Sequence, residues 1–359
     1  MKVPRYLSYL QRWTLIGLAI GVISGLGAAL FYLLLNLGTS FFLRHLASFH
    51  PPLPAGEGEA TAPTFSTVRW WLLALVPGVG GLISGLMVYG LASEAEGHGT
   101  DAVIMAFHKL GGAVRKRIPI VKTIASVATI GSGGSAGREG PIAQIGAGFA
   151  SWLSSILKLK SDRGLMVVCG TAAGIGSIFK APLGGAVFAL EVLYKGDFEV
   201  DALIPSFISS VVAYSVFSSF FGFQPIFDTP RHYLPNPASL FFYGVLGLVT
   251  GGFAILYVTV FYAMRDKIFR KAPLPNYFKP AVGGIMLGLT ALLFPHVLGT
   301  SYGWLQMAIY GELALSTMLA IALAKIFATS FTISSGGSGG IFAPSLVIGG
   351  MVGGPSGKF

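Results

Sequence analysis

One carboxylate stands out among the residues that could do chemistry. Glu139 lies between a glycine-rich stretch, Gly131–Gly137, and a long apolar segment, in a chain with only 14 acidic residues. If that segment lies in a membrane, the carboxylate costs several kcal/mol and is a candidate functional group. The simpler alternative is a structural ion pair with Arg138, although neighbouring residues at a helix start tend to point apart.

Two glycine-rich turns precede apolar helices and have the composition of an anion site. One leads into Pro141 and the other into Pro344. Proline is favoured in a first helical turn, where its missing N–H has no acceptor, and glycines let the preceding amides turn toward one point. Such amides and the positive helix end attract an anion. The alternative is close helix packing through small residues. Neither turn continues as Gly-Lys-Ser/Thr, so P-loop nucleotide binding is not supported.

A third glycine turn holds a histidine. His98 lies between Gly97 and Gly99, just before an expected helix whose first turn contains Asp101. A lone histidine is more often structural, and no paired histidine spacing indicates a metal site. We therefore expect no metal and no cofactor.

Two further residues are weaker candidates. Glu191 ends the apolar run Ala181–Leu190 and is either an internal acid or a helix-end charge. Cys169 is the only cysteine, so intrachain disulfides and thiolate metal clusters are excluded.

The elements that carry these residues belong to an internal repeat. The blocks 122–146 and 325–349 match at an offset of 203, and so do the blocks 77–86 and 280–289. In this alignment Phe342 is the counterpart of Glu139, so the acid is not needed to build the turn. We expect a first membrane repeat over 1–220 and a second, inverted repeat over 221–359 that is incomplete at its C-terminal end.

The composition is that of a polytopic helical membrane protein. Of 359 residues, 11% are charged and 53% apolar, with a mean hydropathy of +0.73 and 50 glycines, whereas a soluble domain carries about 25% charge. Apolar segments such as Leu15–Leu37 and Trp70–Leu91 are long enough to span a membrane. A collagen period and the alternating strands of a β-barrel are not seen.

The charges give the chain an orientation. Most basic residues lie in connectors such as Lys2–Arg12, Lys109–Arg117 and Arg265–Lys271, which the positive-inside rule places in the cytoplasm. The acidic connector Pro51–Thr64, with Glu57, is expected outside. Matching connectors of the two copies thus lie on opposite sides, and the N-terminus is cytoplasmic. The net charge of +10 serves topology rather than nucleic-acid binding.

Three motifs together resemble the CLC chloride channel and chloride–proton antiporter family. They are Gly97–Asp101, Gly137–Pro141 and Gly340–Pro344, in family order. The resemblance implies an all-α fold of tilted and broken helices, a homodimer, one chloride pathway per subunit and a gating glutamate at Glu139. It also implies the following anion-binding residues, mainly through backbone amides: Gly97, His98, Gly99, Arg138, Glu139, Gly140, Gly340, Ile341 and Phe342.

The sequence departs from the family pattern at three places. His98 stands where the family has a serine hydroxyl, and the expected pore tyrosine lies beyond Phe359. Val192 stands where many proton-coupled members have an internal acid.

We expect Cl⁻/H⁺ exchange in a bacterial or archaeal plasma membrane. The alternatives are a passive gated chloride channel, an intramembrane enzyme using Glu139 and His98 as acid and base, and a structural scaffold. The absence of a nucleophile constellation argues against the enzyme.

Overall fold

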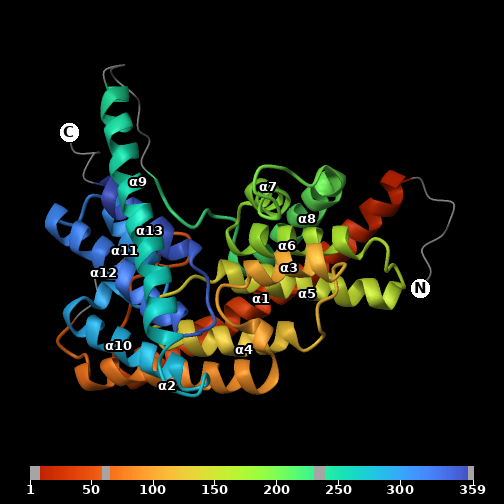
Figure 1. The fold of residues 1–359 in the computed structure, drawn as a ribbon. Helices are drawn as coiled ribbons and strands as arrows, with labels where there is room; N and C mark the ends of the chain where they lie inside the picture. Colours follow the sequence, from red (N-terminus) through yellow and green to blue (C-terminus); the bar gives the residue numbers. More distant parts are fainter. Residues whose placement is uncertain (1–8, 59–64, 230–238, 355–359) are drawn as a thin grey trace. The chain divides into compact units, whose positions relative to one another are not determined.

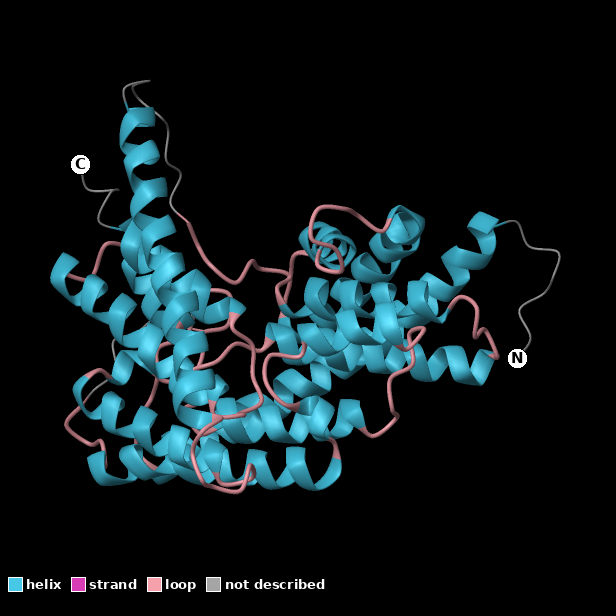
Figure 2. Cartoon of the chain, in the orientation of Figure 1, coloured by secondary structure: helices cyan, strands magenta, loops and turns pink. Residues whose placement is uncertain are grey.

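The computed structural model describes residues 9–58, 65–229 and 239–354, and over these ranges the chain is helical with no strand (Figure 2). Part of the basic N-terminal segment and residues 59–64 of the acidic connector lie outside the described residues. The α-helices, drawn in Figure 1, are α1 (Tyr9–Thr39), α2 (Trp70–Leu91), α3 (Thr100–Lys109), α4 (Ile118–Gly131), α5 (Glu139–Leu157), α6 (Arg163–Ile178), α7 (Pro182–Glu191), α8 (Leu203–Phe221), α9 (Ser239–Ala263), α10 (Lys279–Leu293), α11 (Tyr302–Ile309), α12 (Leu315–Ser334) and α13 (Phe342–Gly353).

Five segments among the described residues are long and apolar enough to cross a membrane. They are Leu10–Leu46, Trp70–Leu91, Val200–Phe221, Leu240–Phe269 and Leu315–Ser334. Several other helices are apolar but shorter, α4 and α13 among them. The all-helical, multi-pass class predicted from composition is therefore confirmed.

The order of elements repeats along the chain. The series α2, a 3₁₀ turn at Ser93–Ala95, α3, α4 and α5 is followed later by α10, a 3₁₀ turn at Pro295–Val297, α11, α12 and α13. The long helices before each series, α1 and α9, both continue into a π-helical turn, at Ser40–Leu46 and Met264–Phe269. The repeat found by sequence offset is thus a repeat of structure.

Glycines hold the two equivalent helices α2 and α10 against each other. A Cβ added to Gly81 would lie 2.1 Å from the carbonyl oxygen of Pro280, and one added to Gly284 would lie 2.2 Å from that of Pro77. The contact is reciprocal because Gly284 and Pro280 are the counterparts of Gly81 and Pro77 in the repeat. Residue numbers rise along α2 as those of the contacted residues fall along α10. The two helices are therefore antiparallel, as inverted copies require.

The two compact units of the structure do not coincide with the two copies of the repeat. One unit consists of residues 1–37, 86–127 and 138–225, and the other of residues 38–85, 128–137 and 226–359. In the first unit α6 packs on α5, α7 and α8, and in the second α12 packs on α9, α10 and α13. Each unit has its own apolar clusters, around Trp13 and Cys169 in the first and around Leu73 and Leu287 in the second. The division at residue 220 stays a prediction about the repeat.

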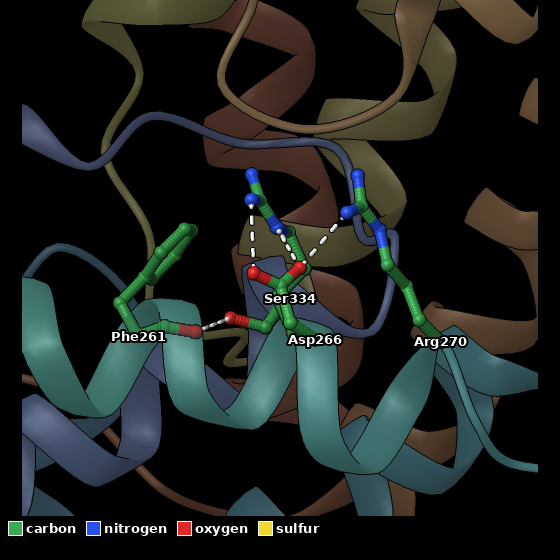
Figure 3. Close-up of polar contacts among 5 residues, drawn as sticks. Phe261, Asp266, Arg270 and Ser334 are labelled. Carbon is green, nitrogen blue, oxygen red and sulfur yellow. Dashed lines mark hydrogen bonds and ion pairs between the residues drawn. The ribbon is translucent and has the colours of Figure 1, made fainter.

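The end of α9 is tied to α12 and carries the basic connector. The Ser334 hydroxyl donates to the Phe261 carbonyl oxygen at 3.0 Å, and Asp266 accepts from Arg265 and Arg270, each at 2.9 Å (Figure 3). Ser334 is the last residue of α12. The hydrogen bond therefore fixes the start of the glycine turn that follows.

Candidate anion site

The two glycine turns have the same backbone geometry. Gly133 has φ of +102° and its counterpart Gly336 has φ of +101°, a region that favours glycine. The next residue in each copy, Gly134 or Gly337, donates its N–H back to a threonine carbonyl five residues earlier, at 2.8 and 3.2 Å. The chain therefore leaves α4 and α12 through the same turn.

The turns are joined to each other by an isolated antiparallel bridge. The Gly137 N–H donates to the Gly340 carbonyl oxygen at 2.7 Å, and the Gly340 N–H donates to the Gly137 carbonyl oxygen at 2.6 Å. The bridge thus connects the residue before Arg138 to the residue before Ile341. Since the Gly340 N–H is used here, Gly340, predicted as an anion-binding residue, contributes the shape of the turn.

Both turns end in the N-terminus of a helix. Arg138 and Ile341 cap α5 and α13 with φ, ψ of −92°, −10° and −102°, −8°. The carbonyl oxygen of each cap accepts the N–H four residues later, from Ile142 or Ser345. Backbone N–H groups of a first turn point out of the helix end, where the dipole is positive. The predicted ligands Arg138, Glu139, Ile341 and Phe342 lie at these two ends.

Glu139 is the first residue of α5 and is only 3% exposed. Arg138 is equally buried, and its guanidinium carbon lies 5.1 Å from the centre of the Tyr32 ring, within the range of a cation–π contact. Phe342, the counterpart of Glu139, is 45% exposed in this chain. The buried carboxylate at the start of α5 therefore has no counterpart at the start of α13.

The third turn presses against α5. Gly97 and Gly99 have φ of +67° and +90°, so both positions favour glycine. A Cβ on Gly99 would lie 2.7 Å from the carbonyl oxygen of Gly140. The Gly97–Gly99 turn therefore packs directly on the first turn of α5, next to Glu139.

His98 uses both ring nitrogens inside its own turn. Nδ1 lies 2.6 Å from the Thr100 hydroxyl, and Nε2 lies 3.1 Å from a carboxylate oxygen of Asp101. In this arrangement neither nitrogen is turned toward a separate anion. These contacts hold the ring at the start of α3, and the anion-binding role of His98 stays a prediction.

Two buried lysines, which the sequence marked only as members of the repeat, hold the turns before α3 and α11. Lys122 on α4 donates to the carbonyl oxygens of Ala95 and Gly97, at 3.0 and 2.7 Å. Lys325 on α12 donates to those of Val297 and Gly299, at 3.0 and 2.8 Å. Both ammonium groups are fully buried. In the sequence, these lysines are marked by their recurrence at the repeat offset of 203 within two apolar segments.

The remaining candidates lie elsewhere on the first unit. Glu191 is the last residue of α7 and is exposed. Val192, next to it, packs against an apolar cluster that includes Leu190 and Ala202. Cys169 is buried. Among the described residues no group of three histidine, cysteine or acidic side chains could hold a metal.

Comparison with known proteins places this geometry in one family. The model of the voltage gated chloride channel family matches residues 80–359. A protein of Ralstonia nicotianae named "Putative chloride channel protein ClcB-like" is 30% identical over 305 residues, covering 83% of this chain and 70% of that protein. The H⁺/Cl⁻ exchange transporter ClcA of Yersinia pestis is 26% identical over 304 residues, covering 82% of this chain and 63% of that protein.

Solved structures agree on the fold. A CLC-type fluoride/proton antiporter superposes with a TM-score of 0.81 at 22% identity, covering 97% of this chain and 82% of that one. A slow cyanobacterial Cl⁻/H⁺ antiporter gives 0.78 at 21% identity, covering 95% and 77%. The bridged glycine turns, the repeated helices and these matches lead to one conclusion: the chain is an integral membrane protein of the voltage-gated chloride channel (CLC) family.

Proposed function

We propose that the protein moves chloride across a membrane in exchange for protons, with Glu139 as the gate. Chloride is the ion named for both the ClcB-like relative and the ClcA relative, and exchange with protons is named for the second. The observation that carries the proposal is the reciprocal bridge between Gly137 and Gly340. It fixes the turns that lead into two helix N-termini, and each is a favourable place for an anion.

The anion would be held mainly by backbone amides. In the external site these would be the amides of Arg138, Glu139 and Gly140, and in the central site those of Ile341 and Phe342. Amide dipoles can replace part of the hydration shell of an ion without binding it too tightly to leave. Such a site makes no covalent bond, so we propose transport rather than catalysis.

Glu139 resembles the transported ion in charge and in accepting hydrogen bonds from amides. Ionised, its carboxylate competes with chloride for the start of α5. Protonated, it loses this attraction and leaves the position to chloride. The same cycle carries one proton, which is how gating and exchange are linked at one side chain.

We also propose the orientation and assembly. The N-terminus and the connectors around Arg117 and Lys271 lie in the cytoplasm of a bacterial or archaeal cell, Glu57 lies outside, and the protein is a homodimer. Single cysteines placed at these positions in a Cys169→Ser background test the orientation by labelling from each side. Labelling of the Glu57 and Lys271 positions from the same side would contradict it.

The function itself is tested with purified protein in liposomes. A chloride gradient is applied, and chloride efflux and proton movement are recorded together. We expect chloride to leave the liposomes and protons to enter them, even against a proton gradient. Chloride efflux with no proton movement would identify a passive channel. Chloride and proton fluxes equal to those of liposomes without protein would reject chloride transport.

A further inference from the structure

We propose that His98 carries protons between the water at Asp101 and the first turn of α5. The inference rests on the proposed exchange function, because exchange requires a route by which protons reach Glu139. Val192, at the end of α7, packs in an apolar cluster and offers no proton-binding group. His98 is the titratable side chain of the turn that packs on α5.

The contacts of the imidazole form a continuous chain of proton-exchanging groups. Asp101 has a side chain that is 79% exposed, whereas that of His98 is 18% exposed. Nε2 of His98 lies 3.1 Å from the Asp101 carboxylate, and Nδ1 lies 2.6 Å from the Thr100 hydroxyl. One end of this chain therefore meets water and the other lies within the turn.

This network accommodates both protonation states of His98. In the neutral ring, Nε2–H donates to Asp101, and Nδ1 accepts from the Thr100 O–H. A proton arriving from water binds Nδ1 once the hydroxyl hydrogen rotates away, and the imidazolium is paired with Asp101. Loss of either ring proton restores a neutral ring. Histidine is the side chain best suited to such exchange near neutral pH.

Charged groups surround the turn on several elements. Lys122 on α4 donates to the Gly97 carbonyl oxygen, and Glu94 and Glu96 belong to the segment just before the turn. Glu139 begins α5, the helix on which the turn packs. The His98 turn is therefore in contact with groups from α4 and α5 as well as from its own segment.

An orphaned oxygen marks the inner end of the route. Gln144 on α5 is 2% exposed, and its Nε2 donates to the Glu94 carbonyl oxygen at 2.7 Å. Among the described residues its Oε1 has no hydrogen-bond partner, and it lies 3.2 Å from the position of a Cβ on Gly99. A buried acceptor without a donor suits a water molecule, which can pass on a proton. This oxygen therefore lies where α5, the helix that begins with Glu139, packs against the histidine turn.

The test measures the ratio of proton to chloride movement in liposomes. His98→Gln keeps a hydrogen-bonding side chain that can contact Thr100 and Asp101, but it does not bind a proton at neutral pH. We expect the ratio to fall at least about tenfold, with a smaller fall in chloride flux. Asp101→Asn lowers the ratio less, because water can deliver protons to the ring directly. His108→Gln, near the C-terminal end of α3, is the control and keeps the ratio of the parent.

Each outcome decides between the proposals. A His98→Gln protein with the parent's ratio overturns the relay. If His98→Gln does not fold, Thr100→Val, which removes only the hydroxyl partner of Nδ1, must lower the ratio for the relay to stand. A parent that moves chloride but no protons also overturns the relay, while chloride transport survives. A parent that moves no chloride rejects the proposed function itself.

Discussion

The two copies of the repeat share their scaffold and differ in their chemistry. Both leave a helix through a glycine with φ near +100°, join at the Gly137–Gly340 bridge and enter a new helix. Only the first copy then has a buried carboxylate, Glu139, where the second has Phe342. The turn geometry therefore does not depend on the Glu139 carboxylate, which is available for a functional role.

The long helices that open the two copies differ in how their glycines are covered. On α1, a Cβ at Gly21 would lie 2.7 Å from atoms of Ser209 and Val212 on α8. On α9, Cβ atoms at Gly247 and Gly251 would meet nothing within 4 Å among the described residues. The same small-residue pattern is thus a packing groove in one copy and an open face in the other.

The largest expected effect comes from breaking the contact that the copies share. Gly81→Leu and Gly284→Leu each push a side chain into a backbone carbonyl of the partner helix, which costs about 3 kcal/mol or more. Because the contact is reciprocal, we expect equal loss of folded protein by size-exclusion chromatography. Gly90→Leu on α2 is the control, since a Cβ there would meet none of the described residues within 4 Å. Loss with only one of the two variants would show that the copies do not pack symmetrically.

The lysine clamps allow a finer comparison of the copies. Lys325 donates to the Ser301 hydroxyl at 2.7 Å in addition to two carbonyl oxygens, whereas Lys122 donates to two carbonyl oxygens. Replacement by methionine leaves these buried acceptors unsatisfied. We expect Lys325→Met to cost about 3 kcal/mol and Lys122→Met about 2 kcal/mol, measured by thermal unfolding in detergent. A larger loss of stability for Lys122→Met than for Lys325→Met would show that the number of hydrogen bonds does not set the size of the effect.

A pH effect distinguishes the 3₁₀ turns of the copies. Burial lowers the pKa of His296, in the second copy, to about 4. The unfolded chain binds a proton near pH 6.5 but the folded chain does not, so stability is complete above pH 6.5 and falls as the pH drops toward 4. At about 1.4 kcal/mol per pH unit below 6.5, we expect the loss to reach about 2 kcal/mol near pH 5. Unfolding of the parent and of His296→Gln as a function of pH measures it; a parallel decline in both would exclude His296 as the cause.

The corresponding position of the first copy gives the smallest effect. Burial acts to raise the pKa of Glu94, but the hydrogen bond and charge of Arg115 outweigh it and hold this pKa below its usual value. Both side chains are partly exposed, so the pair contributes only about 0.5 kcal/mol to the free energy of unfolding. Stability from the pair is present at neutral pH and lost as the pH falls through the lowered pKa. Arg115→Gln therefore matters at pH 7 and not near pH 3 in the same unfolding assay.

The sequence predicted the elements that depend on local patterns. The repeat offset, the helix starts at Glu139 and Phe342, and the turn around His98 follow from glycine, proline and apolar spacing. The contacts of Lys122 with Ala95 and Gly97, and the bridge between Gly137 and Gly340, depend on tertiary packing that spacing does not encode. The contacts of the His98 ring with Thr100 and Asp101 likewise depend on side-chain conformations that the motif does not encode.

The central claim is that one carboxylate, present in only one copy, gates the pathway. Glu139→Gln removes the charge and keeps the shape of the side chain. Chloride flux of the parent and of Glu139→Gln is measured in liposomes between acidic and neutral pH, with proton movement recorded alongside. We expect the parent's flux to rise on acidification, whereas the variant's flux persists, does not respond to pH and moves no protons. A variant whose flux still rises on acidification as the parent's does would contradict the account.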